Sequence, residues 1–151
     1  MNFLTRAVQM VRFKNRYLLI KFEFDDRRIE NYTAQYISNL LREEVRKSFG
    51  DLGLGQSMNM SVKYFNPLTG MGIVRAPRDS YRTVWGAVTL LNKCNERTCK
   101  VEVLKISGTI RKCQLHAIDF DRNFIRQYNY SDKDFEEYRQ SSIQIINSLN
   151  P

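Results

Sequence analysis

The first clear pattern along the chain is an alternation of apolar and polar positions over residues 16–24. A period of two is typical of a strand with one buried face. The apolar positions that share this face are Leu18, Ile20, Phe22 and Phe24. Because Lys21 and Glu23 fall on the other face, the pattern predicts a half-buried strand.

Two segments instead repeat their apolar residues every three to four positions, as amphipathic helices do. The first covers residues 31–49, where Asn31 or Thr33 can cap the start and Gly50 ends the helix. The second follows Pro77 and Asp79. Its apolar stripe consists of Tyr81, Val84, Trp85, Val88 and Leu91. Gly86 lies within that helix, which indicates close packing against a neighbour.

A hairpin is predicted between these two helices. Residues 53–57 read as a loop, and the alternating side chains of a second strand follow. These are Met58, Met60, Val62 and Tyr64. Residues 66–70 form a turn, because Pro67 sets φ and Gly70 can take a positive φ. Residues 71–76 then form the returning strand.

The last third of the chain predicts a fourth strand over 100–107, a short helix from Thr109 to about Phe120, and a final helix. The final helix begins at Ser131, with Asp134 three residues later as in a capping box. The order is β-α-β-β-α-β followed by two helices, which makes the chain α+β. This is the ferredoxin-like plan that RNA recognition motifs share, an antiparallel sheet with two helices on one face. The other face is left to solvent, to the C-terminal helices or to a partner.

Charge narrows the choice of partner. The chain has 24 Lys and Arg against 16 Asp and Glu, a formal net charge of +8. The excess lies in segments 10–28, 63–82 and 93–114, whereas 29–51 and 119–139 are acidic overall. A polyanionic partner is expected if the fold brings the three basic segments together. The alternative is a generally basic surface that serves solubility.

Other features bear on location. No stretch approaches the roughly 18 apolar residues of a membrane span, so we expect no membrane partner. The N-terminal residues lack the apolar core of a secretory signal, and three cysteines fit a reducing compartment better than a disulfide framework. We therefore expect an intracellular protein.

Catalytic and metal-binding patterns are weak. Cys94, Cys99, Cys113 and His116 are residue types that zinc accepts, but the first spacing is at the edge of the usual range and the last pair falls inside a predicted helix. We favour buried thiols and a surface imidazole. No glycine-flanked Ser or Cys lies near the single histidine. The carboxylate pairs of interest for Mg²⁺ are Asp25 with Asp26 and Asp119 with Asp121.

The most informative local feature is the corner 107–112, where a predicted strand stops at Gly108 and a helix starts at Thr109. Arg111 and Lys112 fall in the first turn of that helix. The helix dipole disfavours cations there, whereas the free N–H groups of a helix start bind anions. We therefore expect phosphate to bind at this corner.

Two further segments are candidate contacts to a phosphate backbone. Arg12, Lys14 and Arg16 alternate, so an extended chain projects them to one side. The predicted hairpin turn offers Asn66 and Thr69. The alternatives are a charged lead-in that keeps a sheet edge soluble and a well-formed turn with no contact. The third predicted strand has no aromatic residue for base stacking, so recognition of phosphate and shape fits better.

In this order, these features resemble the small protein subunit of ribonuclease P and ribonuclease MRP, the eukaryotic and archaeal Pop/Rpp family. The matching residues are Met10-Val11-Arg12-Phe13-Lys14, Arg16-Tyr17-Leu18-Leu19, Tyr64, Asn66, Thr69-Gly70, Ile73, Val84-Trp85, Ser107-Gly108-Thr109-Ile110-Arg111 and Cys113-Gln114. The ending Cys113-Gln114 is closer to the eukaryotic branch. The resemblance implies a domain over 10–125, an extension over 1–9 and a C-terminal helix over 126–151 that matches no family motif. Either Met1 or Met10 is compatible with the natural start.

The resemblance implies a non-catalytic subunit of a ribonucleoprotein that removes the 5′ leader of precursor tRNA and, as ribonuclease MRP, processes rRNA. In that family the RNA carries the active site and its Mg²⁺ ions, so no cofactor is expected on the protein. The expected partners are the catalytic domain of the ribonuclease P/MRP RNA, the barrel-shaped thirty-kilodalton subunit, other ribonuclease P/MRP proteins and, indirectly, precursor tRNA. The expected location is the nucleus and nucleolus.

We expect RNA contacts from the basic residues and from the residues that match the family. They are Arg12, Lys14, Arg16, Tyr64, Asn66, Thr69, Gly70, Arg75, Ser107, Gly108, Thr109, Arg111 and Lys112. Two rival hypotheses stay open. One is a ferredoxin-like protein–protein interaction module without an RNA role, and the other is a small metal-dependent nuclease that uses Asp25 and Asp26.

Overall fold

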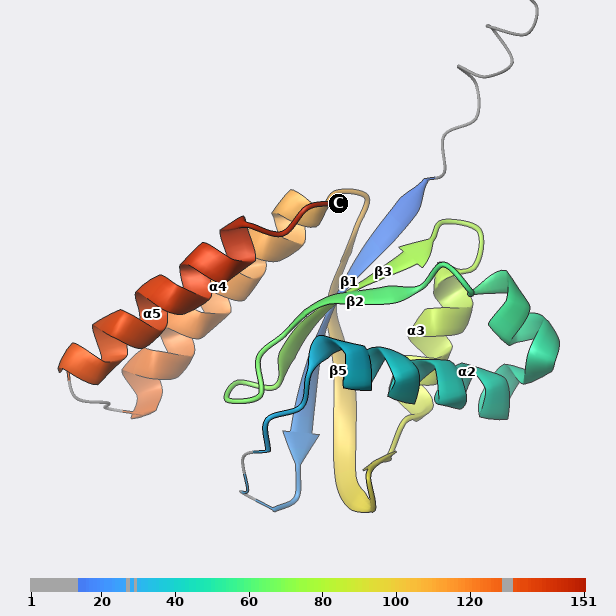
Figure 1. Ribbon diagram of the computed structural model, residues 1–151, viewed down its shortest axis with the longest axis horizontal. Helices are drawn as coiled ribbons and strands as arrows, with labels where there is room; N and C mark the ends of the chain where they lie inside the picture. Colours follow the sequence, from blue (N-terminus) through green and yellow to red (C-terminus); the bar gives the residue numbers. More distant parts are fainter. Residues whose placement is uncertain (1–13, 27, 29, 129–131) are drawn as a thin grey trace, which may run out of the picture.

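A computed structural model of the chain describes residues 14–26, 28, 30–128 and 132–151, which form three layers (Figure 1). The middle layer is an antiparallel sheet with the strand order β2-β3-β1-β5-β4. Its strands are β1 (Asn15–Phe24), β2 (Ser61–Phe65), β3 (Met71–Pro77), β4 (Lys93–Cys94) and β5 (Arg97–Ser107). The helices α2 (Ala34–Gln56) and α3 (Tyr81–Leu90) cover one face, and α4 (Ile110–Tyr128) and α5 (Asp132–Asn147) cover the other.

This arrangement confirms the predicted ferredoxin-like order, and β4 is a two-residue addition that pairs with the start of β5. Of the three occupants considered for the second face, the C-terminal helices are the ones that cover it. The helix α4 runs to Tyr128, beyond the predicted end near Phe120, because no Gly or Pro interrupts it. The predicted cap at Ser131 lies outside the described residues. None of the helices within the described residues is long and apolar enough to cross a membrane.

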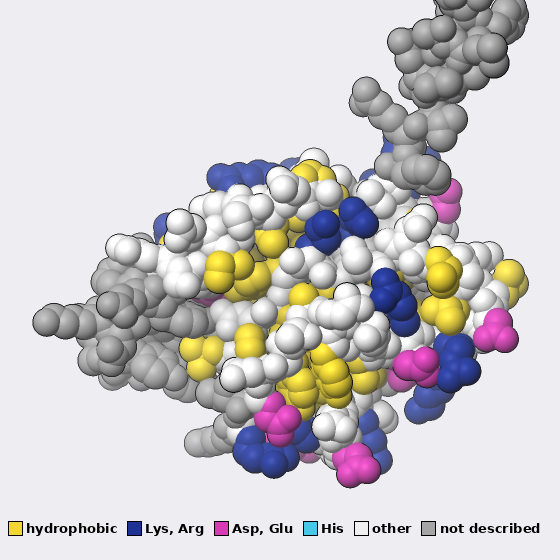
Figure 2. All heavy atoms as spheres, viewed as in Figure 1, with side chains coloured by type: hydrophobic (Ala, Val, Ile, Leu, Met, Phe, Trp, Pro, Cys, Tyr) yellow, Lys and Arg dark blue, Asp and Glu magenta, His cyan; other side chains and the backbone are white. Residues whose placement is uncertain are grey.

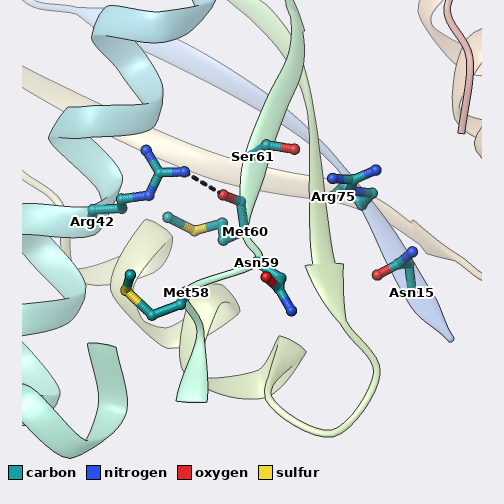
Figure 3. Close-up of a pocket in the computed structure, with 7 residues that line it drawn as sticks. All are labelled: Asn15, Arg42, Met58, Asn59, Met60, Ser61 and Arg75. Carbon is teal, nitrogen blue, oxygen red and sulfur yellow. Dashed lines mark hydrogen bonds between the residues drawn. The ribbon is translucent and has the colours of Figure 1, made fainter. Parts of the chain in front are cut away.

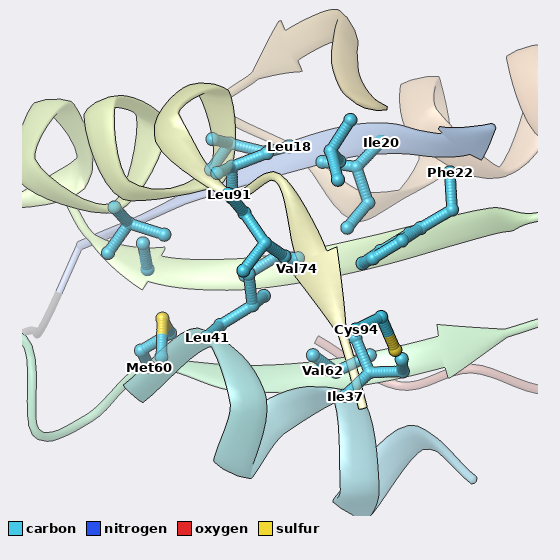
Figure 4. Close-up of a cluster of buried hydrophobic side chains, with 14 of the residues drawn as sticks. Leu18, Ile20, Phe22, Ile37, Leu41, Met60, Val62, Val74, Leu91 and Cys94 are labelled. Atoms are coloured by element: carbon cyan, nitrogen blue, oxygen red, sulfur yellow. The ribbon is translucent and has the colours of Figure 1, made fainter. Parts of the chain in front are cut away.

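The strand β1 is buried on both faces over its first half, so the prediction of a half-buried strand was wrong. Leu18, Ile20 and Phe22 lie in the cluster between the sheet and α2 and α3, which Figure 4 shows. Tyr17 and Leu19 lie in a second cluster, beneath α4 and α5. The alternation did not predict that the second face of β1 is buried, because the helices that cover this face, α4 and α5, come from the far end of the chain.

A bulge in β2 changes the predicted facing of its side chains. Val62 pairs with Val74, but Tyr64 pairs with Ile73, which leaves Lys63 as an extra residue. An extra residue moves the following side chains to the other face of the sheet. Val62 therefore lies in the first cluster and Tyr64 in the second, whereas the alternation had placed both on one face.

The helix α2 extends past its predicted end, and most of the loop predicted over 53–57 is helical. Thr33 caps the start as predicted, because its side chain accepts a backbone N–H of the first turn. Gly50 has a φ of 73° and a ψ of −173°, so the first helical segment ends there as predicted, and a second helical segment follows after a bend. The segment after the bend is held by α3, since the Ser80 hydroxyl donates a hydrogen bond to the Gln56 carbonyl at 2.9 Å.

The helix α3 packs on the sheet through Val84 and Val88, as predicted. Trp85, predicted on the same stripe, is instead 42% exposed. Gly86 confirms the expected close packing, because a Cβ at this position would lie 2.8 Å from the Phe49 ring of α2. The outer side of α3 therefore presents an aromatic ring.

Candidate nucleic-acid interface

The register of the sheet brings three distant segments to one end of the molecule. Tyr17 of β1 pairs with Arg75 of β3 on one side and with Ser107 of β5 on the other. Because β1 runs opposite to both neighbours, its first residues lie beside the last residues of β3 and β5. We call the cations at this end the basic corner, defined by Lys14, Arg16, Arg75, Arg78, Arg111 and Lys112. They come from all three segments in which the sequence concentrates positive charge.

Contacts of the backbone and of the Arg16 side chain hold these segments next to one another. The Arg78 N–H donates to the Lys14 carbonyl at 2.9 Å, which fixes the end of β3 beside the start of β1. The Arg16 guanidinium lies over the corner residue Gly108, where a Cβ would be 3.4 Å from its Nη1. Arg78 was not among the residues predicted from sequence, and its only signal was its place in a basic segment.

The cations of the basic corner are mostly free of ion pairs. Within the described part of the chain, no acidic side chain pairs with Lys14, Arg16, Arg75, Arg111 or Lys112. Arg78 reaches Asp79 only at 4.0 Å, and that carboxylate is 98% exposed. Some cations elsewhere have partners, as in the pairs Lys21–Glu23, Arg46–Glu43 and Lys100–Glu102, whereas others have no ion pair among the described residues. The basic corner is therefore set apart by the number of cations at one end of the sheet. Unpaired like charges held close together favour an anionic partner.

One face of the molecule shows how charged and apolar side chains are distributed over the surface. Figure 2 shows the Lys and Arg side chains in several separate groups and most acidic side chains toward the right and lower margins. Apolar side chains lie between the groups. On this face the positive charge is therefore spread over several places, some of them beside acidic side chains.

Arg75 lines a hollow of about 510 Å³ beside the basic corner, shown in Figure 3. The lining residues are Asn15, Arg42, Met58, Asn59, Met60, Ser61 and Arg75. Arg42 of α2 donates to the Met60 carbonyl at 2.7 Å. In the described part of the chain, the buried Arg75 Nε and Ser61 Oγ have no hydrogen-bond partner. Both atoms can donate a hydrogen bond.

The start of α4 has the predicted arrangement. The Thr109 N–H donates to the Ser107 hydroxyl at 3.2 Å, which shapes the turn from β5 into the helix. The first turn of α4 has no acidic residue and presents Arg111 and Lys112 to solvent. The Arg111 guanidinium donates to the Asn147 side chain at 2.9 Å, so it leans toward the end of α5. Both cations thus lie at the positive end of the helix dipole.

The hairpin turn lies at the opposite end of the sheet from the basic corner, beside the last residues of β1. The Asn66 side chain accepts the Leu68 N–H at 3.0 Å, and the Thr69 hydroxyl accepts a backbone N–H at 3.3 Å. Gly70 has a φ of 73°, and a Cβ there would lie 2.3 Å from the Phe22 carbonyl oxygen. These contacts give the three predicted turn residues a structural role.

Tyr64 is also separate from the basic corner. Its hydroxyl lies 3.4 Å from the Ser142 hydroxyl, which in turn donates to the Asp121 carboxylate. Burial raises the pKa of Tyr64 and of Asp121. This buried chain of polar groups links β2, α4 and α5, so Tyr64 holds the outer layer on the sheet. Arg12 lies outside the described residues.

The residues considered for metal binding are dispersed. Cys94 and Cys99 lie in the first cluster and Cys113 in the second, on opposite faces of the sheet. Burial raises the pKa of the Cys99 and Cys113 thiols to about 11. Asp26 is paired with Arg97. Among the described residues, no three His, Cys, Asp or Glu side chains come together as a metal-binding group.

Comparisons of the sequence with protein families and with known proteins point to one family. The model of the Rpp14/Pop5 family matches residues 16–118. Ribonuclease P/MRP protein subunit POP5 of Schizosaccharomyces pombe is 32% identical over 138 residues, covering 84% of this chain and 99% of that protein. POP5 of Homo sapiens is 32% identical over 142 residues, covering 89% and 87%. Ribonuclease P protein component 2 of Pyrococcus abyssi is 28% identical over 120 residues, covering 80% and 92%.

A solved structure shares the fold. A chain in the cryo-EM structure of yeast ribonuclease MRP matches with a TM-score of 0.52 and 9% identity. The match covers 89% of this chain and 92% of that chain. The family match contains β3, β5, the start of α4 and all of β1 except Asn15. It therefore includes the cations of the basic corner other than Lys14.

Proposed function

The chain belongs to the Rpp14/Pop5 family, and from this premise we propose that it is an RNA-binding protein subunit of ribonuclease P, of ribonuclease MRP or of both. The subunit is non-catalytic. It stabilises the catalytic domain of the RNA, which removes the 5′ leader of precursor tRNA with Mg²⁺ ions held by the RNA. This function places the protein in the nucleus and nucleolus.

The observation that carries this proposal is the basic corner. Its cations come from β1, β3 and α4, and most of them lack an acidic partner among the described residues. Folded RNA brings phosphates of different strands close together, at a cost in repulsion. Cations fixed on a rigid sheet end lower that repulsion and release counterions, which stabilises the RNA fold and its metal sites.

A separate surface supports contact with protein partners, among them the barrel-shaped thirty-kilodalton subunit. On the outer side of α3, Trp85 is 42% and Leu90 57% exposed. Exposed aromatic and aliphatic side chains are common at the centres of protein interfaces. Because α3 and α4 lie on opposite faces of the sheet, protein and RNA can bind at the same time.

Purification of the tagged chain from its own cells tests the proposal. We expect ribonuclease P or ribonuclease MRP RNA, identified by sequencing, together with cleavage of precursor tRNA or rRNA. A complex that contains proteins but no RNA would support the interaction-module hypothesis instead. Cleavage by the isolated recombinant chain with Mg²⁺, lost on Asp25→Asn/Asp26→Asn substitution, would support the nuclease hypothesis.

The salt dependence of RNA binding tests the basic corner itself. The logarithm of affinity falls by about one unit per logarithmic unit of salt for each phosphate contact. The double variant Arg111→Ala/Lys112→Ala should therefore reduce the slope by up to about two units. The control is Lys47→Ala/Lys93→Ala, which removes two exposed cations of α2 and β4. Equal slopes for both variants would rule out a phosphate contact at the start of α4.

A further inference from the structure

A second group of basic side chains follows α4 away from the basic corner. Lys105 of β5 and His116 of α4 meet with 2.8 Å between Nζ and Nε2. Lys112 precedes His116 by one helical turn, so the two side chains lie on the same side of α4. Together they mark the seam between β5 and α4, and Lys112 joins this seam to the basic corner.

Among the side chains that the structure describes, few acids lie near the seam. Neither Lys105 nor Lys112 has an ion pair among the described residues. Asp119, one turn after His116, has its carboxylate 4.0 Å from Arg122. Lys21 of β1 lies over the Phe120 ring, and residues 140–147 of α5 include no titratable side chain.

In the contact between Lys105 and His116, the ammonium group can only donate, so Nε2 is the accepting nitrogen in this arrangement. A doubly protonated imidazole would place a second cation against Lys105. An anion between the two side chains removes this conflict, because it accepts from the ammonium and from a protonated ring.

We propose that Lys105, Lys112 and His116 form a phosphate-binding site that takes up one proton from solvent when an RNA phosphate binds. The site rests on the proposed RNA-binding function and deepens it, because it extends the path of the RNA backbone from the basic corner along α4. No covalent bond changes. Nε2 of His116 gains the proton and can no longer accept a hydrogen bond. The RNA phosphate then accepts the hydrogen bond from Lys105 in place of Nε2.

The site makes RNA affinity depend on pH. An imidazole exchanges its second proton near neutral pH, and the phosphate diester stays anionic there, so a site that binds the protonated ring binds RNA more tightly as pH falls. We expect affinity to rise by about three- to tenfold between about pH 8 and about pH 6. The chain has one histidine, so substitution of His116 isolates the histidine contribution to this dependence.

The test measures binding of the full chain to a transcript of the ribonuclease P RNA of its own organism, by fluorescence anisotropy at constant ionic strength. Two variants of His116 should reproduce the weakest and the tightest RNA affinity of the wild type. His116→Gln should bind with the weaker affinity of the wild type at about pH 8, at every pH. His116→Lys carries a permanent charge and should bind tightly at every pH. Far-UV circular dichroism confirms that both variants are folded.

A matched pair of lysine variants tests the second partner. Lys105→Gln should weaken binding and reduce the salt slope by about one unit, whereas Lys93→Gln, at an exposed position in β4, should leave both unchanged. Binding without pH dependence, or a His116→Gln variant that keeps the wild-type dependence, overturns this site alone. Absence of RNA binding at every pH overturns the proposed function as well.

Discussion

The Arg97 guanidinium is 5% exposed and lies 4.0 Å from the centroid of the Phe24 ring. It donates to the Asp26 carboxylate and, at 3.1 Å, to the Tyr32 hydroxyl. This side chain therefore fastens the segment after β1 to the start of β5. The hydrogen bond from Arg97 is the main reason why the pKa of Asp26 falls to about 2. In the sequence, Arg97 was one of many basic residues and Asp26 was half of a possible Mg²⁺ pair.

The lowered pKa of Asp26 predicts how acid acts on the fold. A carboxylate whose pKa is lower in the folded state stabilises the fold above its unfolded pKa, about 4, and loses that contribution as pH falls through its folded pKa. Asp26→Asn should therefore be less stable than the wild type at neutral pH, and the gap should narrow toward about pH 2. Urea unfolding followed by circular dichroism over this range measures the gap. Asp79→Asn, at a 98% exposed position, is the control. A gap that stays constant down to about pH 2 would contradict the argument.

At the scale of elements, apolar periodicity predicted the type and order of the main helices and strands, because each has a buried face of regular spacing. The errors lie where contacts from elsewhere in the chain decide the outcome. Gly50 takes the positive φ expected of a helix end, but the segment after it is helical instead of a loop, and its last residue, Gln56, is held by Ser80. The alternation of apolar and polar residues does not predict the bulge at Lys63, because the extra residue is defined only by how β2 pairs with β3.

Two glycines of similar appearance in the sequence should respond in opposite ways to substitution. Gly70→Ala should lower the free energy of unfolding by about 2–4 kcal/mol, because the position needs a positive φ and a Cβ would meet the Phe22 carbonyl at 2.3 Å. Gly55→Ala should raise it by about 0.5–1 kcal/mol, because this helical position has nothing within 4 Å of the added carbon. Chemical denaturation of both variants gives the comparison. A neutral Gly70→Ala would mean that the hairpin turn is not rigidly held against β1.

At the scale of the whole molecule, the sequence showed three basic segments but not their meeting point. Antiparallel pairing of β1 with both β3 and β5 brings Lys14, Arg16 and Arg75 together with the start of α4. The same pairing carries the hairpin turn, with Asn66 and Thr69, to the other end of the sheet. The spacing of residues along the chain predicts neither the meeting of the basic segments nor the distant position of the hairpin turn, because both depend on which strands are neighbours in the sheet. The predicted strand, turn and helix at 107–112 are confirmed, because these three elements are contiguous in the sequence. Phosphate binding there stays a prediction.

The shared sheet also makes the outer layer of α4 and α5 part of one folding unit. Neighbouring residues of β1 face opposite clusters, with Leu18 in the first and Leu19 in the second. Loss of either cluster therefore exposes the same strand, and we expect one cooperative unfolding transition. Trp85, the single tryptophan, reports on the α3 side, while circular dichroism reports on all helices.

Two core variants on opposite faces test this unity. Ile37→Ala in α2 and Ile146→Ala in α5 both truncate side chains with 0% exposure, and each should lower the free energy of unfolding by about 2–5 kcal/mol. If the layers unfold together, Ile146→Ala shifts the Trp85 fluorescence transition as far as the circular dichroism transition, although α5 and α3 lie on opposite faces. Ile145→Ala, at a 50% exposed neighbouring position, should shift both by less than about 1 kcal/mol. If Ile146→Ala leaves the Trp85 transition unchanged while helix content falls at lower urea, α4 and α5 form a separate layer that the RNA or a protein partner must hold in place.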